Sequence, residues 1–510
     1  MTIKKYAEKI KSFLDKHSKL TDVLLFFVMI YLSAETVRNV VYCAESEFQI
    51  HRDIFTFKSA LFFLILVLIL RKANLFRLPY LFAIPAYGIY YYRNMSIYTP
   101  EDYGVDLSSW HSVLLIANGI FLITFIDTYL RFKDKEKRTK LDWYGIATFS
   151  VGAVLLGINY NYSRLFLFPL LALFTTEMTK KTWRKFVDAF SIGYYLAFLY
   201  VFTNSYMVDR TLFKGHYYGT FLNVATGSAF CVGAFVCAIY GILRAKELRC
   251  RILTVVSCIL IPYPLFAIVL FNERSGYLAV FMVIAFLAIF FRFDSGKVAG
   301  WKKRAVISAS VLLVIATVSV IGLILFTKAN TGALKEFLRE NVSEYLVDTV
   351  DMYTRRAESL LYKGSYLHII PENSWLNPID NLSSWRISYW INSFERTTLW
   401  GDGLLYVGND YFESTNPHST FVSAYRMYGY VGGTIFFIWA IFTFVYVTRK
   451  VLKGNTDLSF TFLWTVFFMT YSLVETALWS YIMGFTFLVV LYPLGKKFKA
   501  EENEELALEE

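Results

Sequence analysis

Three side chains in this sequence can do chemistry on a charged substrate: Arg274, Arg386 and His418. A histidine can accept a proton near neutral pH, as a general base must. A guanidinium group stays charged at any working pH and binds phosphate oxygens through paired hydrogen bonds. His418 lies in the segment Thr415–Thr420, between a Gly401-Asp402-Gly403 turn and the start of a long apolar run. These residues therefore suggest proton transfer next to an anion site.

The composition predicts that this chemistry takes place in an integral membrane protein. Of 510 residues, 56% are hydrophobic and only 18% are charged, and the mean hydropathy is +0.44. A soluble domain of this size would not tolerate so apolar a composition. The net charge of +11 comes mostly from basic residues between apolar runs. We read it as a signal for membrane topology and expect no nucleic-acid partner.

Apolar runs long enough to cross a bilayer predict an all-α, polytopic fold of about 12–14 transmembrane helices. The predicted spans are 21–42, 55–70, 78–92, 110–130, 143–159, 162–177, 186–207, 219–243, 252–272, 275–292, 304–327, 418–447, 457–474 and 476–494. Basic runs fall on alternate loops, which places those loops and both termini in the cytoplasm. The active side is then extracytoplasmic.

This topology divides the chain into five parts. They are a cytoplasmic N-terminus at 1–20, a first membrane domain of eleven spans at 21–327, an extracytoplasmic loop domain at 328–417, three last spans at 418–494 and an acidic cytoplasmic tail at 495–510. The large, partly helical loop thus ends at His418. The histidine is expected at the boundary between water and membrane, where a membrane enzyme would keep its site.

Two helices are predicted in the outer loop. Residues 334–362 have an amphipathic pattern and should lie flat over the membrane domain. A second helix, Ser383–Trp400, follows good capping residues and stops at Gly401. Within it Arg386 and Trp390 are four residues apart, so they should project from nearly the same face. The alternative for this pair is a solvated arginine stacked on tryptophan.

Arg274 is expected in a short outer turn between the spans 252–272 and 275–292, close to the plane of the lipid headgroups. Pro262 and Pro264 predict a kink in the span before it, which could open a groove for a lipid chain. The alternative for Arg274 is an arginine that pairs with lipid phosphate or with Glu273. For His418 it is a capping or core histidine at a helix start.

Several other chemistries are not indicated. The six histidines show no metal-ligand spacing, and no P-loop or Rossmann glycine pattern is present. Most of the five cysteines fall in predicted spans or in a cytoplasmic loop, which excludes a disulfide framework. We therefore expect no metal, no cofactor and no direct use of a nucleotide.

The order of these motifs resembles the O-antigen ligase and O-antigen polymerase superfamily. The resemblance covers about residues 210–490 and consists of the Arg386-to-Trp390 helix, the Gly401–Gly403 turn, His418, and Gly429 with Gly432 in the next helix. Upstream, Gly219–Asn223 is similar to the family's Gly-x-Phe-x-Asn segment and Asn272–Gly276 to its short outer turn. Ser419 stands where ligases generally have Asn, which favours a polymerase.

The resemblance implies a bacterial plasma-membrane glycosyltransferase with His418, Arg274 and Arg386 as catalytic residues. It would polymerise undecaprenyl-diphosphate-linked oligosaccharide repeats into O-antigen, capsular or exopolysaccharide by metal-independent inverting transfer. A glycan donor, a glycan acceptor and membrane lipids are its expected partners, with a flippase and a chain-length regulator as further candidates. The predicted substrate-binding residues are Arg164, Arg210, Lys214, His216, Asn223 and Trp390.

Two other functions stay open on the sequence. A ligase would use the same donor and transfer the glycan to lipid A core, to teichoic acid or to protein. A flippase or transporter of lipid-linked oligosaccharides would also be polytopic, with basic residues facing a diphosphate lipid. Charges deep in mid-span and internal repeats would favour transport, and the sequence shows no such symmetry.

Overall fold

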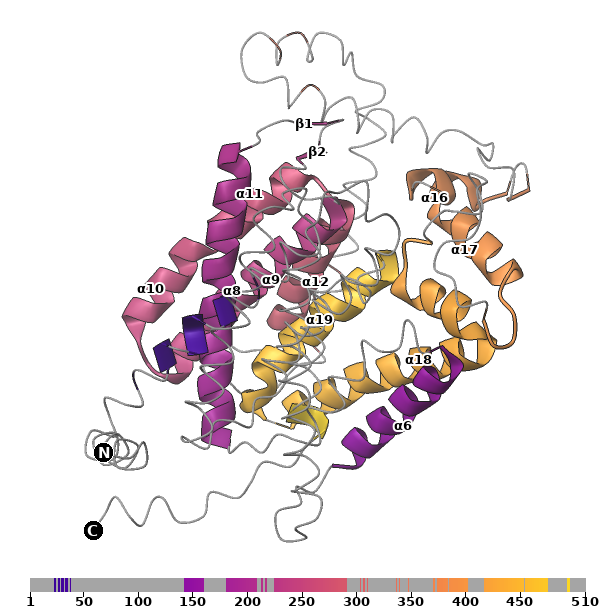
Figure 1. Ribbon diagram of the computed structural model, residues 1–510. Helices are drawn as coiled ribbons and strands as arrows, with labels where there is room; N and C mark the ends of the chain where they lie inside the picture. Colours follow the sequence, from indigo (N-terminus) through magenta and orange to yellow (C-terminus); the bar gives the residue numbers. More distant parts are fainter. Residues whose placement is uncertain are drawn as a thin grey trace, which may run out of the picture.

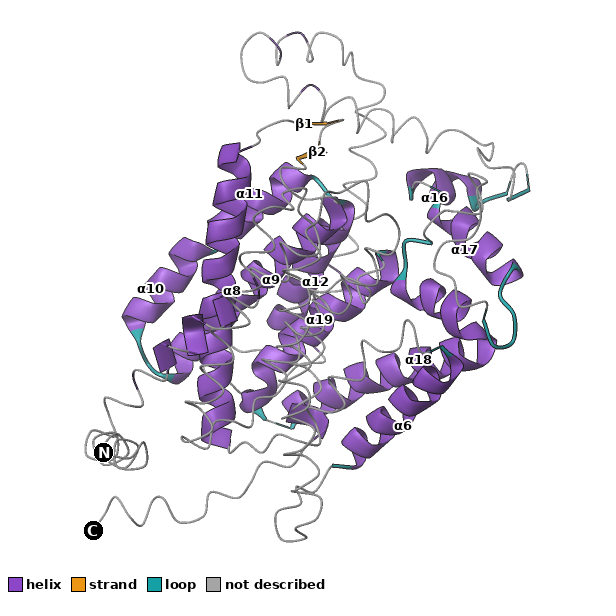
Figure 2. Ribbon diagram, viewed as in Figure 1, coloured by secondary structure: helices purple, strands orange, loops and turns teal. Residues whose placement is uncertain are grey.

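The computed structural model describes five main stretches of the chain, 142–159, 180–208, 224–290, 370–401 and 417–475, apart from residues 372, 373, 384 and 454. It also describes single residues or short pieces within 23–37, 212–217, 303–347 and 493–495. In these parts the chain is helical except for one small antiparallel hairpin of β1 (Leu212–Phe213) and β2 (His216–Tyr217). Figures 1 and 2 show the arrangement.

The structure describes the following helices, given in the order of the sequence. They are α6 (Trp143–Ile158), α8 (Lys180–Val208), α9 (Val224–Glu247), α10 (Arg251–Leu260), α11 (Pro262–Phe271), α12 (Arg274–Phe290), α16 (Asn377–Leu382), α17 (Arg386–Glu395), α18 (Thr420–Leu452), the 3-10 turn η3 (Thr456–Leu458) and α19 (Ser459–Val474).

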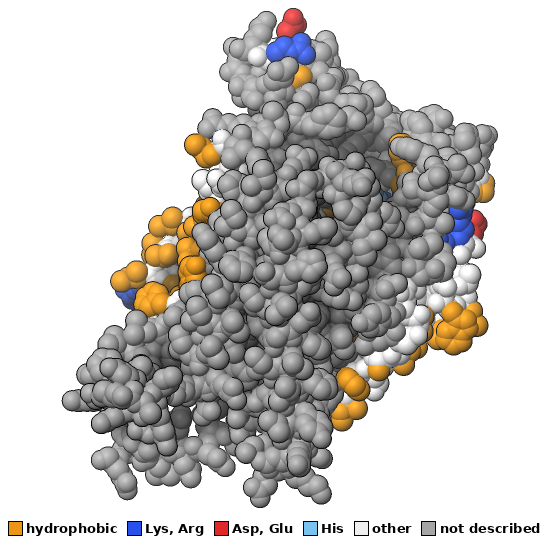
Figure 3. Space-filling model, in the orientation of Figure 1, with side chains coloured by type: hydrophobic (Ala, Val, Ile, Leu, Met, Phe, Trp, Pro, Cys, Tyr) orange, Lys and Arg blue, Asp and Glu red, His pale blue; other side chains and the backbone are white. Residues whose placement is uncertain are grey.

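Four described helical segments are long and apolar enough to cross a membrane. They are Trp183–Met207, Val224–Glu247, Arg251–Phe271 and Thr420–Leu452. The segment Arg251–Phe271 leaves large apolar side chains uncovered, with Ile252 77% and Ile259 69% exposed. Figure 3 shows this apolar edge over α10. Such a surface suits lipid rather than water, so the described parts support the prediction of a helical membrane protein.

The remaining predicted spans and the amphipathic helix at 334–362 lie wholly or largely outside the described residues. The spans concerned are 21–42, 55–70, 78–92, 110–130, 162–177, 304–327 and 476–494. The total span count and the division into domains therefore stay predictions.

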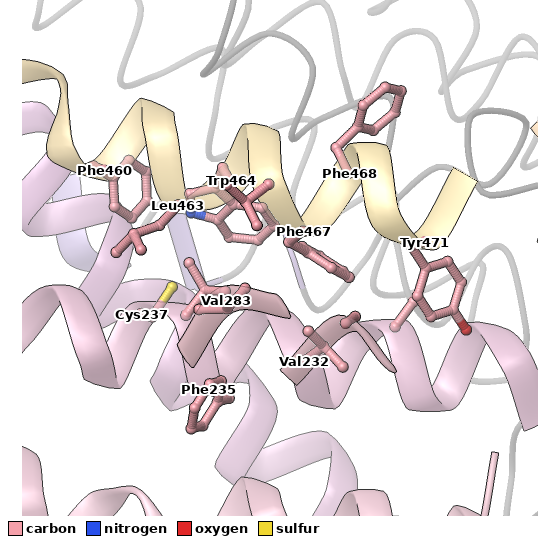
Figure 4. Close-up of a cluster of buried hydrophobic side chains, with 14 of the residues drawn as sticks. Val232, Phe235, Cys237, Val283, Phe460, Leu463, Trp464, Phe467, Phe468 and Tyr471 are labelled. Atoms are coloured by element: carbon pink, nitrogen blue, oxygen red, sulfur yellow. The ribbon is translucent and has the colours of Figure 1, made fainter. Parts of the chain in front are cut away.

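Helix α9 lies at the centre of the described bundle. It packs against α8, α10, α11, α12 and α19, and every residue from Thr226 to Ile239 is buried. A helix that is apolar on all sides is stable only when neighbours cover it all round. Figure 4 shows Phe460, Trp464 and Phe467 of α19 directed toward α9. This packing sets the position of the end of α19, where the candidate site begins.

The main-chain hydrogen bonds of the span before Arg274 are interrupted at its two prolines, between α10 and α11, although the backbone at Ile261 stays helical with φ −61° and ψ −43°. Pro264 has no N–H to offer the Leu260 carbonyl four residues earlier. The Tyr195 hydroxyl of α8 donates to that carbonyl instead, at 2.5 Å. A neighbouring helix thus replaces the missing main-chain bond, which is how interrupted helices are tolerated inside membranes.

Ion pairs join one end of the bundle. Arg244, near the end of α9, binds Asp188 of α8 with Nε 3.0 Å from Oδ2. Asp457 in η3 lies 2.5 Å from Lys180 at the start of α8 and also accepts from Arg184. The starts of α8 and α19 and the ends of α9 and α18 therefore meet here. The basic runs 180–185, 244–251 and 449–453 share this end, as the predicted topology requires.

The helix predicted over Ser383–Trp400 is shorter in the structure, where α17 runs from Arg386 to Glu395. Its first turn is not capped by the predicted residues. Asp380 of α16 does this instead, because its Oδ1 accepts from Ser388 N at 2.9 Å and its Oδ2 from Ser388 Oγ at 2.6 Å. Trp385 turns the chain between the two helices with a left-handed φ of 64°. Helices α16 and α17 thus form a helical hairpin with the buried Asp380 carboxylate at its corner.

Helix α18 is broken at Gly429, whose φ of 69° and ψ of −175° are not helical. The break releases two main-chain N–H groups from the helix. Tyr430 N donates to the Thr398 carbonyl at 3.1 Å and Val431 N to the Leu399 carbonyl at 3.2 Å. The segment after α17 is therefore extended along α18 instead of continuing the helix, which explains why the predicted helix ends early.

Glycines make the contact between the segment after α17 and α18 possible, because the two main chains lie against each other with no room for a side chain. A Cβ atom on Gly429 would lie 2.3 Å from the Leu399 carbonyl oxygen, and one on Gly401 would lie 2.6 Å from that of Met427. Both distances are far shorter than any real Cβ contact. The Met427 carbonyl, released by the break, accepts from Asn159 Nδ2 at 3.2 Å. Gly401 and Gly429, two glycines of the predicted motif, thus allow the chain after the α16–α17 hairpin to pack directly against the backbone of α18.

Candidate functional site

One buried carboxylate, that of Glu475, organises the candidate site. Glu475 follows α19 directly, and its side chain is 6% exposed. Its Oε1 accepts a hydrogen bond from Arg386 Nη2, and its Oε2 lies 3.2 Å from His418 Nδ1. The structure therefore brings two of the three predicted catalytic residues together on a single acidic side chain.

Arg386 also faces a second carboxylate. Its Nη2 lies 3.9 Å from Glu273 Oε1, in the turn between α11 and α12. Ser275 Oγ donates to the same Glu273 oxygen at 3.1 Å. The turn consists of Asn272 and Glu273 alone, and Asn272 closes α11 with a left-handed φ of 49°. The guanidinium is thus held between two acidic residues, each on a different segment of the bundle.

Arg274, the third predicted catalytic residue, begins α12 directly after Glu273 and is partly exposed. The short turn keeps it close to the residue that faces Arg386. Two arginines and two glutamates therefore gather at this end of the bundle, opposite the end joined by the Asp188 and Asp457 ion pairs. The side chains of Arg386, Glu273 and Glu475 are 12%, 17% and 6% exposed, so water screens these three charges less than surface charges.

The backbone on both sides of His418 is fixed. His418 itself has a left-handed φ of 49°, and the next residue, Ser419, is the N-cap of α18. Ser419 Oγ accepts from Val422 N at 3.5 Å and donates to the Ser472 carbonyl at 3.3 Å. The imidazole is 44% exposed, so it reaches Glu475 while remaining open to a substrate. Strained backbone of this kind persists where the surroundings determine it.

The start of α18 is tied to the end of α19 through the main chain. Thr420 N and Thr420 Oγ1 donate to the Glu475 carbonyl oxygen at 3.0 and 2.9 Å. One turn earlier in α19, the Tyr471 hydroxyl donates to the Ala225 carbonyl in the first turn of α9. The segment Gly219–Asn223, which resembles a family motif, leads directly into that turn. The first turn of α9 and the carboxylate site therefore lie close together.

Trp390 binds the main chain directly before His418. Its indole Nε1 donates to the Pro417 carbonyl at 2.7 Å. Arg386 and Trp390, four residues apart on α17, thus bind neighbouring parts of the site, Arg386 the Glu475 carboxylate and Trp390 the Pro417 carbonyl. In the structure Trp390 positions the backbone before His418, whereas the sequence suggested a contact with substrate.

Removing this indole N–H should destabilise the protein measurably. Trp390→Phe leaves the Pro417 carbonyl without its donor, and we expect the free energy of unfolding to fall by about 1–3 kcal/mol. Thermal unfolding of the purified protein in detergent checks this. Trp375→Phe is the matched control, because Trp375 is 75% exposed and its loss should cost less than about 0.5 kcal/mol. Equal midpoints for the two variants would contradict a positioning role for Trp390.

The other predicted substrate-binding residues are not placed. Arg164, Arg210, Lys214 and Asn223 lie outside the described residues. His216 belongs to β2, but its side chain is not described. Their roles stay predictions.

The sequence interpretation did not identify the two acidic residues of the site. For Glu475 a signal was present, since it is the single charged residue between Asp457 and Lys496. A lone carboxylate in so long an apolar run is costly and usually functional. Glu273 was considered only as a local partner of Arg274. In the structure it faces Arg386, which is remote in sequence.

The arrangement combines a proton acceptor with an anion-binding pair at the end of an apolar bundle. The side chain of His418 is 44% exposed, Arg386 shares Glu475 with it, and Arg274 begins α12 directly after Glu273, which faces Arg386. Among the described residues, no group of three or more His, Cys, Asp or Glu side chains could hold a metal ion. These groups suit acid–base and anion chemistry. No family model, curated protein or solved structure matches the chain.

Proposed function

We propose that this protein is a membrane glycosyltransferase that transfers glycan from a polyprenyl-diphosphate carrier to a sugar hydroxyl. The observation that carries the proposal is the meeting of His418 and Arg386 on Glu475. A base and an anion-binding group are the two activities that such a transfer requires. The most specific form of the proposal is a polymerase of undecaprenyl-diphosphate-linked repeat units in surface polysaccharide synthesis.

The location of the site is consistent with an extracytoplasmic reaction. The basic runs of the described helices share one end of the bundle, and the site lies at the other. Because basic loops stay in the cytoplasm, the site would face the outer side of the plasma membrane. Lipid-linked glycans are presented to polymerases on that side, with their energy already stored in the diphosphate bond.

Arg386, Arg274 and His418 have different roles in the proposed reaction. Arg386 and Arg274 hold the diphosphate and stabilise the negative charge that builds up as it leaves. His418 removes the proton from the acceptor hydroxyl, which then attacks the anomeric carbon from the opposite face. One displacement is enough, so the transfer inverts the configuration at that carbon and needs no covalent enzyme intermediate.

The lipid part of the donor also has a suitable surface. The apolar edge of Arg251–Phe271 ends at Asn272, directly before Glu273 and the site. Its exposed side chains include Ile259, Phe266 and Val269. A polyprenyl chain lying along this edge would bring its diphosphate to Arg274. The interruption at Ile261 lies on the same edge, where the sequence predicted a groove.

A ligase remains the second candidate, because it shares the donor chemistry and differs in the acceptor. Ser419 does not distinguish the two. In the structure this residue caps α18, and Ser and Asn are equally good at that position. The choice between polymerase and ligase therefore depends on the products formed.

The test supplies purified protein in nanodiscs with lipid-linked glycans extracted from host cells that lack it. We expect a ladder of lipid-linked polymer from the wild-type protein. Arg386→Lys keeps the charge but loses the paired donors, and should slow the reaction by about 10-fold or more. Arg396→Ala is the control, because Arg396 is exposed at the end of α17 and bonds Asn392 outside the site. Lipid movement across the membrane with no new glycosidic bond would instead indicate a flippase.

A further inference from the structure

The contact between Glu475 and His418 bears on which imidazole nitrogen carries the proton. A carboxylate has no proton to donate, so the proton between Glu475 Oε2 and His418 Nδ1 must sit on the imidazole. In a neutral imidazole whose Nδ1 carries the proton, Nε2 is the nitrogen that can accept one. That nitrogen belongs to a ring that is 44% exposed, while Glu475 is almost fully covered.

We infer that Glu475 is the positioning residue of His418, which selects Nε2 as the proton-accepting atom and stabilises the imidazolium formed during transfer. The inference rests on the proposed function, since it assigns a role in that reaction. In the step itself the acceptor O–H bond breaks and an N–H bond forms at Nε2. The acceptor oxygen bonds the anomeric carbon, and the bond from that carbon to the diphosphate oxygen breaks with its electron pair.

Charges of alternating sign support this role. Glu273, Arg386, Glu475 and His418 contact one another in that order, through separations of 3.9 Å at the first pair and 3.2 Å at the last. When His418 gains its proton, the series becomes negative, positive, negative, positive. The site gains one positive charge as the diphosphate departs with its negative charge. An interaction that strengthens during the reaction lowers the barrier, unlike one that binds the substrate equally throughout.

The side chain of Glu475 is not what joins α18 to α19. That contact uses the main-chain carbonyl of Glu475, which accepts both bonds from Thr420. A change of side chain leaves these bonds available. Glu475→Gln should therefore fold and keep its one amide oxygen as an acceptor for Nδ1–H, while it loses the charge and the hydrogen bond that the second oxygen accepts from Arg386.

The experiment compares kcat and KM for the extracted lipid-linked glycan donor in three variants. Glu475→Gln should lower kcat by roughly 10- to 100-fold, a larger change than any rise in KM that follows from the altered contact with Arg386. Glu475→Asp, which keeps the charge, should recover part of the loss. Glu273→Gln is the matched control, since it removes a carboxylate beside Arg386 that does not touch His418, and its kcat should fall less than that of Glu475→Gln.

A second measurement combines substitutions. In a His418→Asn background, Glu475→Gln should lower kcat far less than it does in the wild-type protein, because only the part that acts through Arg386 remains. A wild-type kcat in Glu475→Gln, or a rise in KM alone, would overturn the inference. If the wild-type protein itself forms no glycosidic bond, the proposed function fails instead, so the two failures are distinguishable.

Discussion

Replacing His418 by asparagine should lower the rate of glycan transfer by about 10²- to 10⁴-fold, the usual contribution of a general base. Asparagine has no basic nitrogen, so the acceptor hydroxyl would keep its proton. Because His418 has a φ of 49°, asparagine is also the best replacement for the backbone, since it tolerates left-handed conformations. Its amide can still donate to Glu475.

Single-turnover product formation and thermal unfolding should be measured together on this variant. We expect an unchanged unfolding midpoint with the loss of rate. His418→Ala serves as the comparison, because alanine adds backbone strain of about 1 kcal/mol or more at the same position. If His418→Asn were as fast as the wild type, His418 would be a structural residue at the start of α18 and the site assignment would be wrong.

The second large effect is expected at Gly429 and concerns folding. Its backbone conformation lies in a region that only glycine occupies readily, and a Cβ there would meet the Leu399 carbonyl at 2.3 Å. Gly429→Ala should therefore destabilise the protein by more than about 3 kcal/mol, since strain and a clash between backbones add. The yield of monodisperse protein and its unfolding midpoint both report this loss.

Gly157→Ala is the matched control for this prediction. Gly157 lies in α6 with nothing within 4 Å of the added Cβ. Alanine should be neutral or stabilising there, by up to about 1 kcal/mol, because it is the better helix former. If Gly429→Ala were as stable as the control, α18 would be able to straighten and the α16–α17 hairpin to separate from it, and the prediction would be wrong.

The presence of a helix could be predicted where an apolar run is long and uninterrupted. The span 252–272 and its two prolines correspond to α10 and α11, and 457–474 corresponds to α19. Helix ends were predicted less well, because they depend on tertiary contacts. Helix α8 starts at Lys180, six residues before its predicted span, since basic residues in its first turns pair with Asp457. Hydropathy carries no information about such a pairing.

The site was predictable in its side-chain types and only partly in its geometry. The spacing of Arg386 and Trp390 indicates a shared face, and in the structure Trp390 binds the Pro417 carbonyl next to His418 while Arg386 binds Glu475, the partner of His418. The carboxylate that joins Arg386 to His418 was not predicted, because Glu475 is remote from both in sequence. Hydrogen bonds between remote segments leave no periodicity in a sequence. A lone charge in an apolar run is the nearest signal available.

The break in α18 has a consequence for the bilayer that surrounds the protein. The part after the break, Tyr430–Leu452, rises about 34 Å at 1.5 Å per residue, enough by itself for a hydrocarbon core of about 30 Å. Residues 420–428 are therefore not needed for the crossing and instead carry the start of α18 to Glu475. Tilting of Tyr430–Leu452 can then compensate for a mismatch between helix length and bilayer thickness. Membranes of different thickness would leave the separation between His418 and Glu475 unchanged.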